Sequence, residues 1–102
     1  MTYHALEKLI NLHDGYRQVF LVNSQKMLLI QEHGRRYLIQ ADCPHSDWPM
    51  QNAHISGDII TCGKHGWAFS LHSGQGINER ALGCRMKCYK LVYEDNTVGV
   101  VV

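Results

Sequence analysis

Two short motifs constrain this 102-residue chain more than any other feature of its sequence. Residues 43–45 read C-P-H and residues 62–65 read C-G-K-H, with 16 residues between the two motifs. Each motif places one thiol and one imidazole on a tight loop beside a predicted strand end, so the two loops can meet at one end of a sheet. Thiolates and imidazoles are metal ligands. The candidate ligands are therefore Cys43, His45, Cys62 and His65.

The rest of the chain has the pattern of β-structure, and no segment of helical period exceeds one or two turns. Apolar runs between turn-forming residues predict strands at 16–22, 26–31, 36–41, 58–61, 67–71 and 88–93, and a closing hairpin in which 87–93 and 97–102 flank an acidic turn at 94–96. Near the N-terminus, a short helix fits Leu6, Leu9, Ile10 and His13 as well as a strand and a turn do. We predict an all-β fold, an antiparallel sandwich or small barrel, as a single domain over residues 1–102.

One segment interrupts the strand pattern. Residues 42–52 read DCPHSDWPMQN and contain both prolines of the chain, Pro44 and Pro49. A long irregular loop inside a compact β domain is usually functional or held by a ligand. We therefore expect an inserted metal-binding lobe over about residues 42–72, with the two motif loops at its tip.

Two kinds of metal centre accept this ligand set. Zinc binds two Cys and two His, but zinc motifs usually pair Cys with Cys and His with His along the chain. In a Rieske-type [2Fe-2S] cluster, two imidazoles replace two thiolates on one iron, and the loss of negative charge raises the reduction potential. The alternating order and the following Gly66 favour the cluster, with one Cys and one His from each loop. A structural zinc domain is the rival, and a visible spectrum separates the two because zinc is colourless.

The sequence resembles the Rieske ferredoxins of bacterial ring-hydroxylating oxygenase systems. The resemblance is carried by CPH at 43–45, SGDIITCGKHGWAFSLHSG at 56–74 and YKLVYEDNTVGV at 89–100. It implies a soluble one-electron carrier that takes electrons from an NADH-dependent, flavin-containing ferredoxin reductase and passes them to a terminal oxygenase, either a dioxygenase or a monooxygenase. The small Rieske-like subunit of assimilatory nitrite reductase is the alternative that the same resemblance leaves open.

The chain departs from the Rieske subunits of respiratory cytochrome complexes at four positions. Those subunits carry a second Cys in each loop and form a disulfide, where this chain has Trp48 and Lys64. They also carry a Ser and a Tyr that donate hydrogen bonds to sulfur, where this chain has Trp67 and Phe69. Such hydrogen bonds stabilise the added electron. We therefore expect a potential in the low part of the Rieske range, which runs from roughly −150 to +300 mV.

Composition and charge exclude other partners. The formal net charge is +1 with both signs scattered along the chain, whereas a nucleic-acid surface needs a concentrated basic patch. No apolar run approaches the roughly 20 residues that span a membrane, and residues 1–10 lack the regions of a secretory signal. We expect a cytoplasmic protein without nucleic-acid or membrane partners. Thiols are kept reduced in that compartment, which favours metal ligation over disulfides.

Two further thiols lie outside the two motifs. Cys84 and Cys88 have a C-x-x-x-C spacing that could bind a metal or form a disulfide. They stand where the resembling family has no ligand, so we interpret them as free cysteines.

Oxygenase chemistry needs an iron held by two His and a carboxylate, and the remaining sequence offers no compact motif of that kind. We therefore expect an electron-transfer component and not an enzyme.

Overall fold

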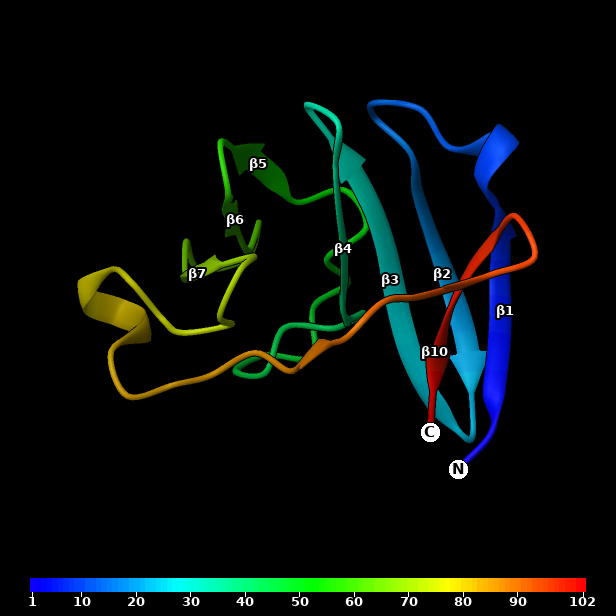
Figure 1. Cartoon of the computed structure of the whole chain (residues 1–102). Coiled ribbons are helices and arrows are strands. Elements are labelled where there is room, and N and C mark those ends of the chain that lie inside the picture. The colour runs from blue at the N-terminus through cyan, green and yellow to red at the C-terminus, as the bar shows by residue number, and fades with distance from the viewer.

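The structure, a computed structural model, describes residues 1–102 and contains ten β-strands and two 3-10 helices of three residues each. In chain order these are β1 (Tyr3–Lys8), η1 (Leu9–Asn11), β2 (Arg17–Val22), β3 (Gln25–Glu32), β4 (Arg35–Gln40), β5 (His54–Ser56), β6 (Ile59–Thr61), β7 (Ala68–Ser70), η2 (Glu79–Ala81), β8 (Cys88–Tyr89), β9 (Val92–Glu94) and β10 (Thr97–Val101). The strands form three antiparallel sheets with the orders β1-β10-β9, β2-β3-β4-β8 and β5-β6-β7 (Figure 1). The prediction of an all-β fold of antiparallel sheets is confirmed.

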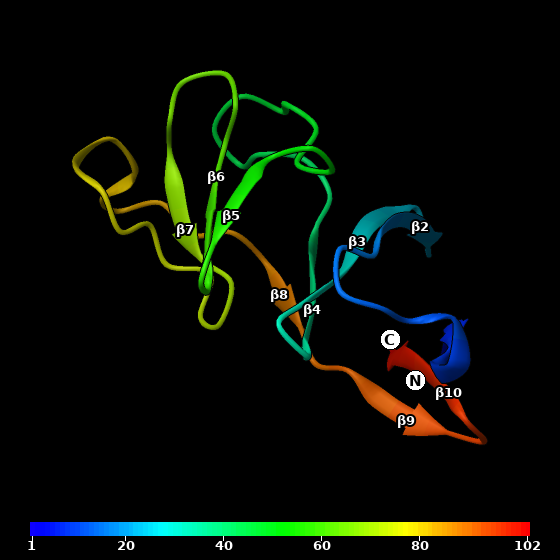
Figure 2. The same ribbon diagram turned by 90° about the horizontal axis from the view of Figure 1, so that it is seen from above.

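The four-stranded sheet is the central layer of the molecule. Met27 and Leu29 of β3 pack into one buried cluster with Val98 of β10. The alternate residues Leu28 and Ile30 pack into a second cluster on the other face of the sheet. The run 27–30 is therefore apolar at every position because β3 is covered on both faces. Figures 1 and 2 show the β1-β10-β9 sheet on one side of this layer and the β5-β6-β7 sheet on the other.

Tight turns set the register of the long hairpins. The connections β2–β3, β3–β4 and β9–β10 each have two central residues with positive φ, which is the geometry of a type I′ turn. The φ values are 49° and 67° at Asn23-Ser24, 50° and 75° at His33-Gly34, and 48° and 63° at Asp95-Asn96. Because a two-residue I′ turn matches the right-handed twist of its strands, the predicted meander and closing hairpin form where the sequence placed them.

The predicted strand at 88–93 is wrong as a single element. Its first part, β8, pairs with Leu38 and Ile39 of β4. Its last part, β9, pairs with β10 in a different sheet. At Lys90 and Leu91 the chain passes from the four-stranded β2-β3-β4-β8 sheet to the β1-β10-β9 sheet. The N-terminal segment, for which the sequence left two interpretations open, forms β1 followed by η1. The short strand β5 is an addition to the predicted set.

The segment between β4 and β8 carries the features of the candidate site. It contains β5, β6, β7 and η2, and two irregular loops at residues 42–53 and 62–67. In Figure 2 this segment stands apart from the β1-β10-β9 sheet, with both loops at the end remote from that sheet. No helix of the structure has the length and apolar content needed to cross a membrane.

Candidate metal centre

The first motif lies on a loop closed by its own backbone. We call residues 43–48, which follow β4, the first loop. The N–H of Cys43 donates to the carbonyl of Trp48 at 2.8 Å, and the N–H of Asp47 donates to the carbonyl of Cys43 at 2.9 Å. Asp47 has φ 55°, in the left-handed region that turns the chain back toward Trp48. Cys43 is thereby fixed at the base of the loop.

The second motif has the same hydrogen-bonded form. We call residues 62–67, which join β6 to β7, the second loop. The N–H of Cys62 donates to the carbonyl of Trp67 at 2.8 Å, and the N–H of Gly66 donates to the carbonyl of Cys62 at 3.1 Å. Gly66 has φ 71° and occupies the position that Asp47 has in the first loop. The two loops are therefore related in conformation, and each begins at a cysteine.

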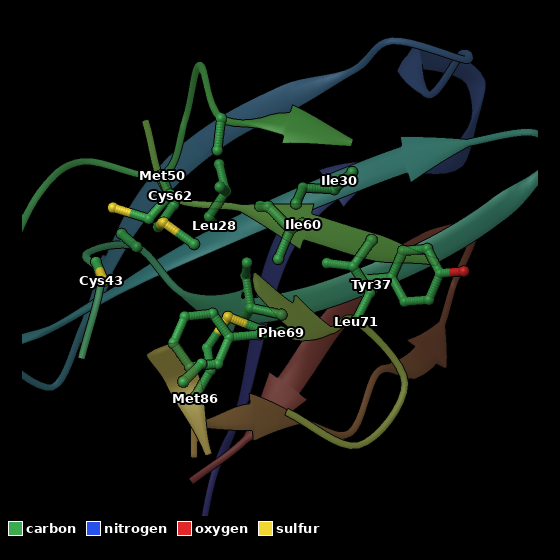
Figure 3. Packing of buried hydrophobic residues seen from close by; sticks show 14 residues of the cluster. Leu28, Ile30, Tyr37, Cys43, Met50, Ile60, Cys62, Phe69, Leu71 and Met86 are labelled. Atoms are coloured by element: carbon green, nitrogen blue, oxygen red, sulfur yellow. The ribbon is translucent and has the colours of Figure 1, made fainter. Parts of the chain in front are cut away.

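The two cysteines of the motifs lie together and are buried. Cys43 is 0% exposed and Cys62 is 1% exposed, and neither forms a disulfide. The Cys43 thiol lies close enough to the Cys62 sulfur to lower the pKa of Cys62. Figure 3 shows both side chains beside Met50 at one end of the buried apolar cluster that continues through Ile60 and Phe69. The thiols thus project from the edge of the core.

Hydrogen bonds around Cys62 favour its thiolate form. Burial alone would raise the pKa of this thiol. The backbone N–H of Lys64, the thiol of Cys43, the hydroxyl of Ser46 and the backbone N–H of His65 oppose burial and hold the pKa of Cys62 below its ordinary value. The Ser46 oxygen lies 3.8 Å from the Cys62 sulfur. The thiolate is the form that binds metal, so this environment suits a ligand.

The two histidines of the motifs form a second pair at the surface. His45 and His65 are both exposed, and their ring centroids are 5.5 Å apart with the planes tilted by 57°. The His45 ring also stacks on Trp67, with centroids 3.8 Å apart and the planes only 6° from parallel. Trp67 therefore covers one face of His45 and limits the orientations of its ring.

This arrangement of donors fits a two-iron cluster. No group of three or more His, Cys, Asp or Glu side chains converges as a single metal ion requires. Instead, the thiols form one buried pair and the imidazoles form one exposed pair. A Rieske-type cluster needs two thiolates on one iron and two imidazoles on the other. The paired donors match that demand better than the single tetrahedral point of a zinc site.

The comparison with protein families identifies the kind of centre. Residues 3–90 match the family model described as the Rieske [2Fe-2S] domain. The chain belongs to this family. Its metal centre is accordingly a Rieske-type [2Fe-2S] cluster.

Among curated proteins, the chain is similar to the ferredoxin component of the alkene monooxygenase system of Xanthobacter autotrophicus. The two sequences are 36% identical over 69 residues, which are 67% of this chain and 57% of the relative. The match therefore spans little more than half of the relative's length.

Solved structures agree with the Rieske fold. The ferredoxin of carbazole 1,9a-dioxygenase from Nocardioides aromaticivorans superposes with a TM-score of 0.84 at 18% identity, covering 98% of this chain and 97% of that chain. The ferredoxin of Sphingomonas yanoikuyae gives a TM-score of 0.84 at 19% identity and 97% coverage of both chains. A protein described as the small subunit of an NADPH nitrite reductase gives 0.79 at 20% identity over the whole of both chains. At these identities, the likeness concerns the fold.

Trp48 and Lys64, which stand where respiratory Rieske subunits have their disulfide cysteines, contact each other. The Lys64 ammonium lies over the Trp48 ring, 5.6 Å from its centroid. Trp48 is 46% exposed, so it forms part of the surface. Phe69 is completely buried, and Trp67 packs against the same apolar cluster. Neither donates a hydrogen bond to sulfur, so the expectation of a low potential stands as a prediction.

Three polar residues that contact the two candidate loops were missed by sequence reasoning. Ser46 contacts the Cys62 sulfur. Asn78 donates to the carbonyl of Gly66 at 2.7 Å, and Arg80 donates to the carbonyl of His65 at 3.3 Å. Asn78 and Arg80 lie more than ten residues from the second loop in sequence. No local pattern marks such contacts, because they arise only when the chain after β7 folds back.

The other two thiols of the chain lie outside the two candidate loops. Cys84 and Cys88 are free cysteines, as interpreted from sequence. Cys84 packs against the buried apolar cluster. The Cys88 sulfur donates to the carbonyl of Leu71 at 3.7 Å, and burial raises the pKa of the Cys88 thiol above its ordinary value. A thiol with a raised pKa is a poor metal ligand.

Proposed function

We propose that this chain carries single electrons through a Rieske cluster held by Cys43, His45, Cys62 and His65. In this assignment the two cysteines bind the inner iron and the two histidines bind the outer iron. The observation that carries the proposal is the division of the donors into a buried thiol pair and an exposed imidazole pair. When bound, the cluster supplies a centre that takes up and gives up one electron at a time.

The protein residues divide the work of such a carrier. The apolar cluster around Cys43 and Cys62 keeps water from the inner side of the site. The exposed rings of His45 and His65 give the shortest path from the outer iron to a docked protein. A carrier has to leave one partner before it meets the next, so we expect a small interface, below about 1,200 Å².

We further propose two partners for this carrier. Electrons would come from an NADH-dependent, flavin-containing ferredoxin reductase and would go to a terminal oxygenase, a dioxygenase or a monooxygenase. The relative named as the ferredoxin component of an alkene monooxygenase system supports this assignment. A ferredoxin of similar fold, at 16% identity, is known in complex with the oxygenase of carbazole 1,9a-dioxygenase. In this scheme the chain is an electron-transfer component in the cytoplasm and the oxygenase performs the chemistry.

The small subunit of an assimilatory nitrite reductase is the second candidate. Its support is the likeness to such a subunit over the full length of both chains. The alkene monooxygenase relative favours the oxygenase system, since its 36% identity is higher than the 20% of the nitrite reductase subunit.

The test of the proposal is metal analysis followed by electron transfer. We expect the purified protein to contain two irons and two sulfides per chain, as a [2Fe-2S] cluster requires, and to be coloured. The coloured protein should be reduced by NADH and the reductase, and then reoxidised by the oxygenase with its substrate and oxygen. A colourless protein with one zinc per chain would refute the cluster assignment. Reoxidation only by a nitrite reductase would favour the second candidate.

A further inference from the structure

The segment that follows β7 folds back onto the second loop. Asn78 is central to this contact. Its side-chain amide donates to the carbonyl of Gly66 at 2.7 Å, while its side-chain oxygen accepts from the N–H of Ala68 at 3.3 Å. The same oxygen accepts from the N–H of Ala81 at 3.2 Å and thereby caps η2. Asn78 thus holds the backbone on both sides of Trp67, the residue that stacks on His45.

Arg80 adds a second connection from the same segment. Its guanidinium donates to the carbonyl of His65 at 3.3 Å. The carbonyls of His65 and Gly66 are neighbours in the chain, so Arg80 and Asn78 hold two consecutive peptide groups of the second loop. Each peptide group is planar, so fixing the direction of its carbonyl also fixes the direction of the N–H in the same group.

The segment can hold the loop because it is itself fixed to the body of the lobe. Ala81 is completely buried, and its carbonyl accepts from the N–H of Cys84. A Cβ at Gly76 would overlap the carbonyl of Ala81, so only glycine lets the chain at residue 76 approach η2 this closely. The N–H of Ile77 donates to the carbonyl of Ala68 at 3.0 Å. These contacts anchor the segment from Gly76 to Cys84.

The second loop presents N–H donors to a ligand sulfur. The backbone N–H groups of Lys64 and His65 act on the Cys62 sulfur as hydrogen-bond donors that lower the pKa of this thiol. Hydrogen bonds to cluster and ligand sulfurs stabilise the reduced state and raise the reduction potential. The strength of these bonds depends on the orientation of the peptide groups between Cys62 and Gly66. Arg80 fixes the peptide group that follows these donors, whose N–H is that of Gly66 and closes the loop by donating to the carbonyl of Cys62 at 3.1 Å. Asn78 fixes the next peptide group, so the two side chains hold the end of the loop that carries the donors.

We propose that Asn78 and Arg80 are positioning residues that set the reduction potential of the cluster. They hold the second loop so that its N–H groups point at the Cys62 sulfur and its tryptophan stacks on His45. The inference rests on the proposed ligand set. It adds a third chain segment, residues 76–84, to the two loops that carry the ligands.

Three variants test this proposal. Asn78→Ala removes both the donor and the acceptor of this side chain. Asn78→Asp keeps the acceptor for Ala68 and Ala81 but loses the donor to Gly66. Arg80→Ala removes the bond to His65. Asn96→Asp, in the β9–β10 turn, repeats the chemical change of Asn78→Asp far from the loops. Iron content, the midpoint potential from protein-film voltammetry and the electron paramagnetic resonance spectrum of the reduced protein are measured for each.

We expect both Asn78 variants and Arg80→Ala to keep their iron and to have a more negative midpoint potential and a changed resonance spectrum. The expected shift is up to about tenfold in the ratio of reduced to oxidised protein at a fixed potential, which is about 59 mV for one electron. Asn96→Asp should match the wild type.

Unchanged potentials and spectra in iron-loaded Asn78→Ala and Arg80→Ala would overturn the proposal. A shift in Asn78→Asp alone would also overturn it, since the added charge would then be the cause. If Asn78→Ala fails to fold, the remaining two variants decide by the same criteria. The iron content of the wild type tests the ligand set separately, so a failure there is distinguishable from a failure here.

Discussion

At the scale of single residues, Ser46 offers the simplest test of how the protein adjusts its potential. Its hydroxyl lies 3.8 Å from the Cys62 sulfur. Ser46→Ala removes this bond, which is worth about 1 kcal/mol or less, and should lower the midpoint potential without loss of iron. Voltammetry measures the shift, with Ser73→Ala in the exposed turn after β7 as the control. Equal potentials in both variants would mean that the Ser46 hydroxyl does not reach the sulfur of the loaded protein.

The ligand assignment makes a stronger prediction about Cys43. Cys43→Ala should lose the cluster and a large part of the free energy of unfolding, because metal-binding free energy is folding free energy in a site of this kind. Cys84→Ala removes a thiol outside the site and should keep two irons per chain, the content of a [2Fe-2S] cluster. Iron and sulfide assays with thermal denaturation compare the two. Full iron content in Cys43→Ala would remove that residue from the ligand set.

The residues that sequence could predict are those whose chemistry is local. The four candidate ligands stand in two short motifs with a spacing that specifies their role, and the structure gathers them as two pairs. Ser46, Asn78 and Arg80 carry no such signal, because each acts on a residue of the other loop or of another segment.

At the scale of elements, the central strand β3 connects the two buried clusters. Leu28 is completely buried in the cluster that includes both motif cysteines, whereas Leu21 of β2 is 72% exposed. Leu28→Ala should reduce the free energy of unfolding by about 2–5 kcal/mol through a cavity. Leu21→Ala should change it by no more than about 0.5 kcal/mol. Urea denaturation of the two variants checks this difference, and equal losses would contradict the two-faced packing of β3.

Strands were predictable where a turn and an apolar run occur together. The meander β2-β3-β4 follows from two turns of the I′ type between apolar runs. Strand β5 was missed because its three residues have no apolar alternation and pair only with β6. The break between β8 and β9 was missed because residues 88–93 are continuous in their strand-like pattern. Only the pairing of their two ends with different sheets divides them.

At the scale of the whole molecule, the loop end should be the docking face for both redox partners. Lys64 and Asp47 are exposed charges beside the two histidines. Lys64→Glu and Asp47→Lys should change the rate of reductase-to-oxygenase electron transfer in opposite directions at low salt, by roughly two- to tenfold. Lys8→Glu is the control, because β1 lies in the sheet farthest from the loops (Figure 1). Wild-type rates in all three variants would place the docking face elsewhere.

The central claim is that two histidines bind one iron of the cluster. Pulsed electron–nuclear double resonance on the reduced protein tests it most directly, because it detects nitrogen nuclei bonded to the paramagnetic centre. We predict couplings from two imidazole nitrogens in the wild type and from one in His65→Cys, with two irons per chain in both, since a thiolate can replace an imidazole as a cluster ligand. His72→Cys, at an exposed histidine outside the two loops, should keep both couplings. A reduced wild-type protein without any bonded nitrogen would contradict the assignment of His45 and His65.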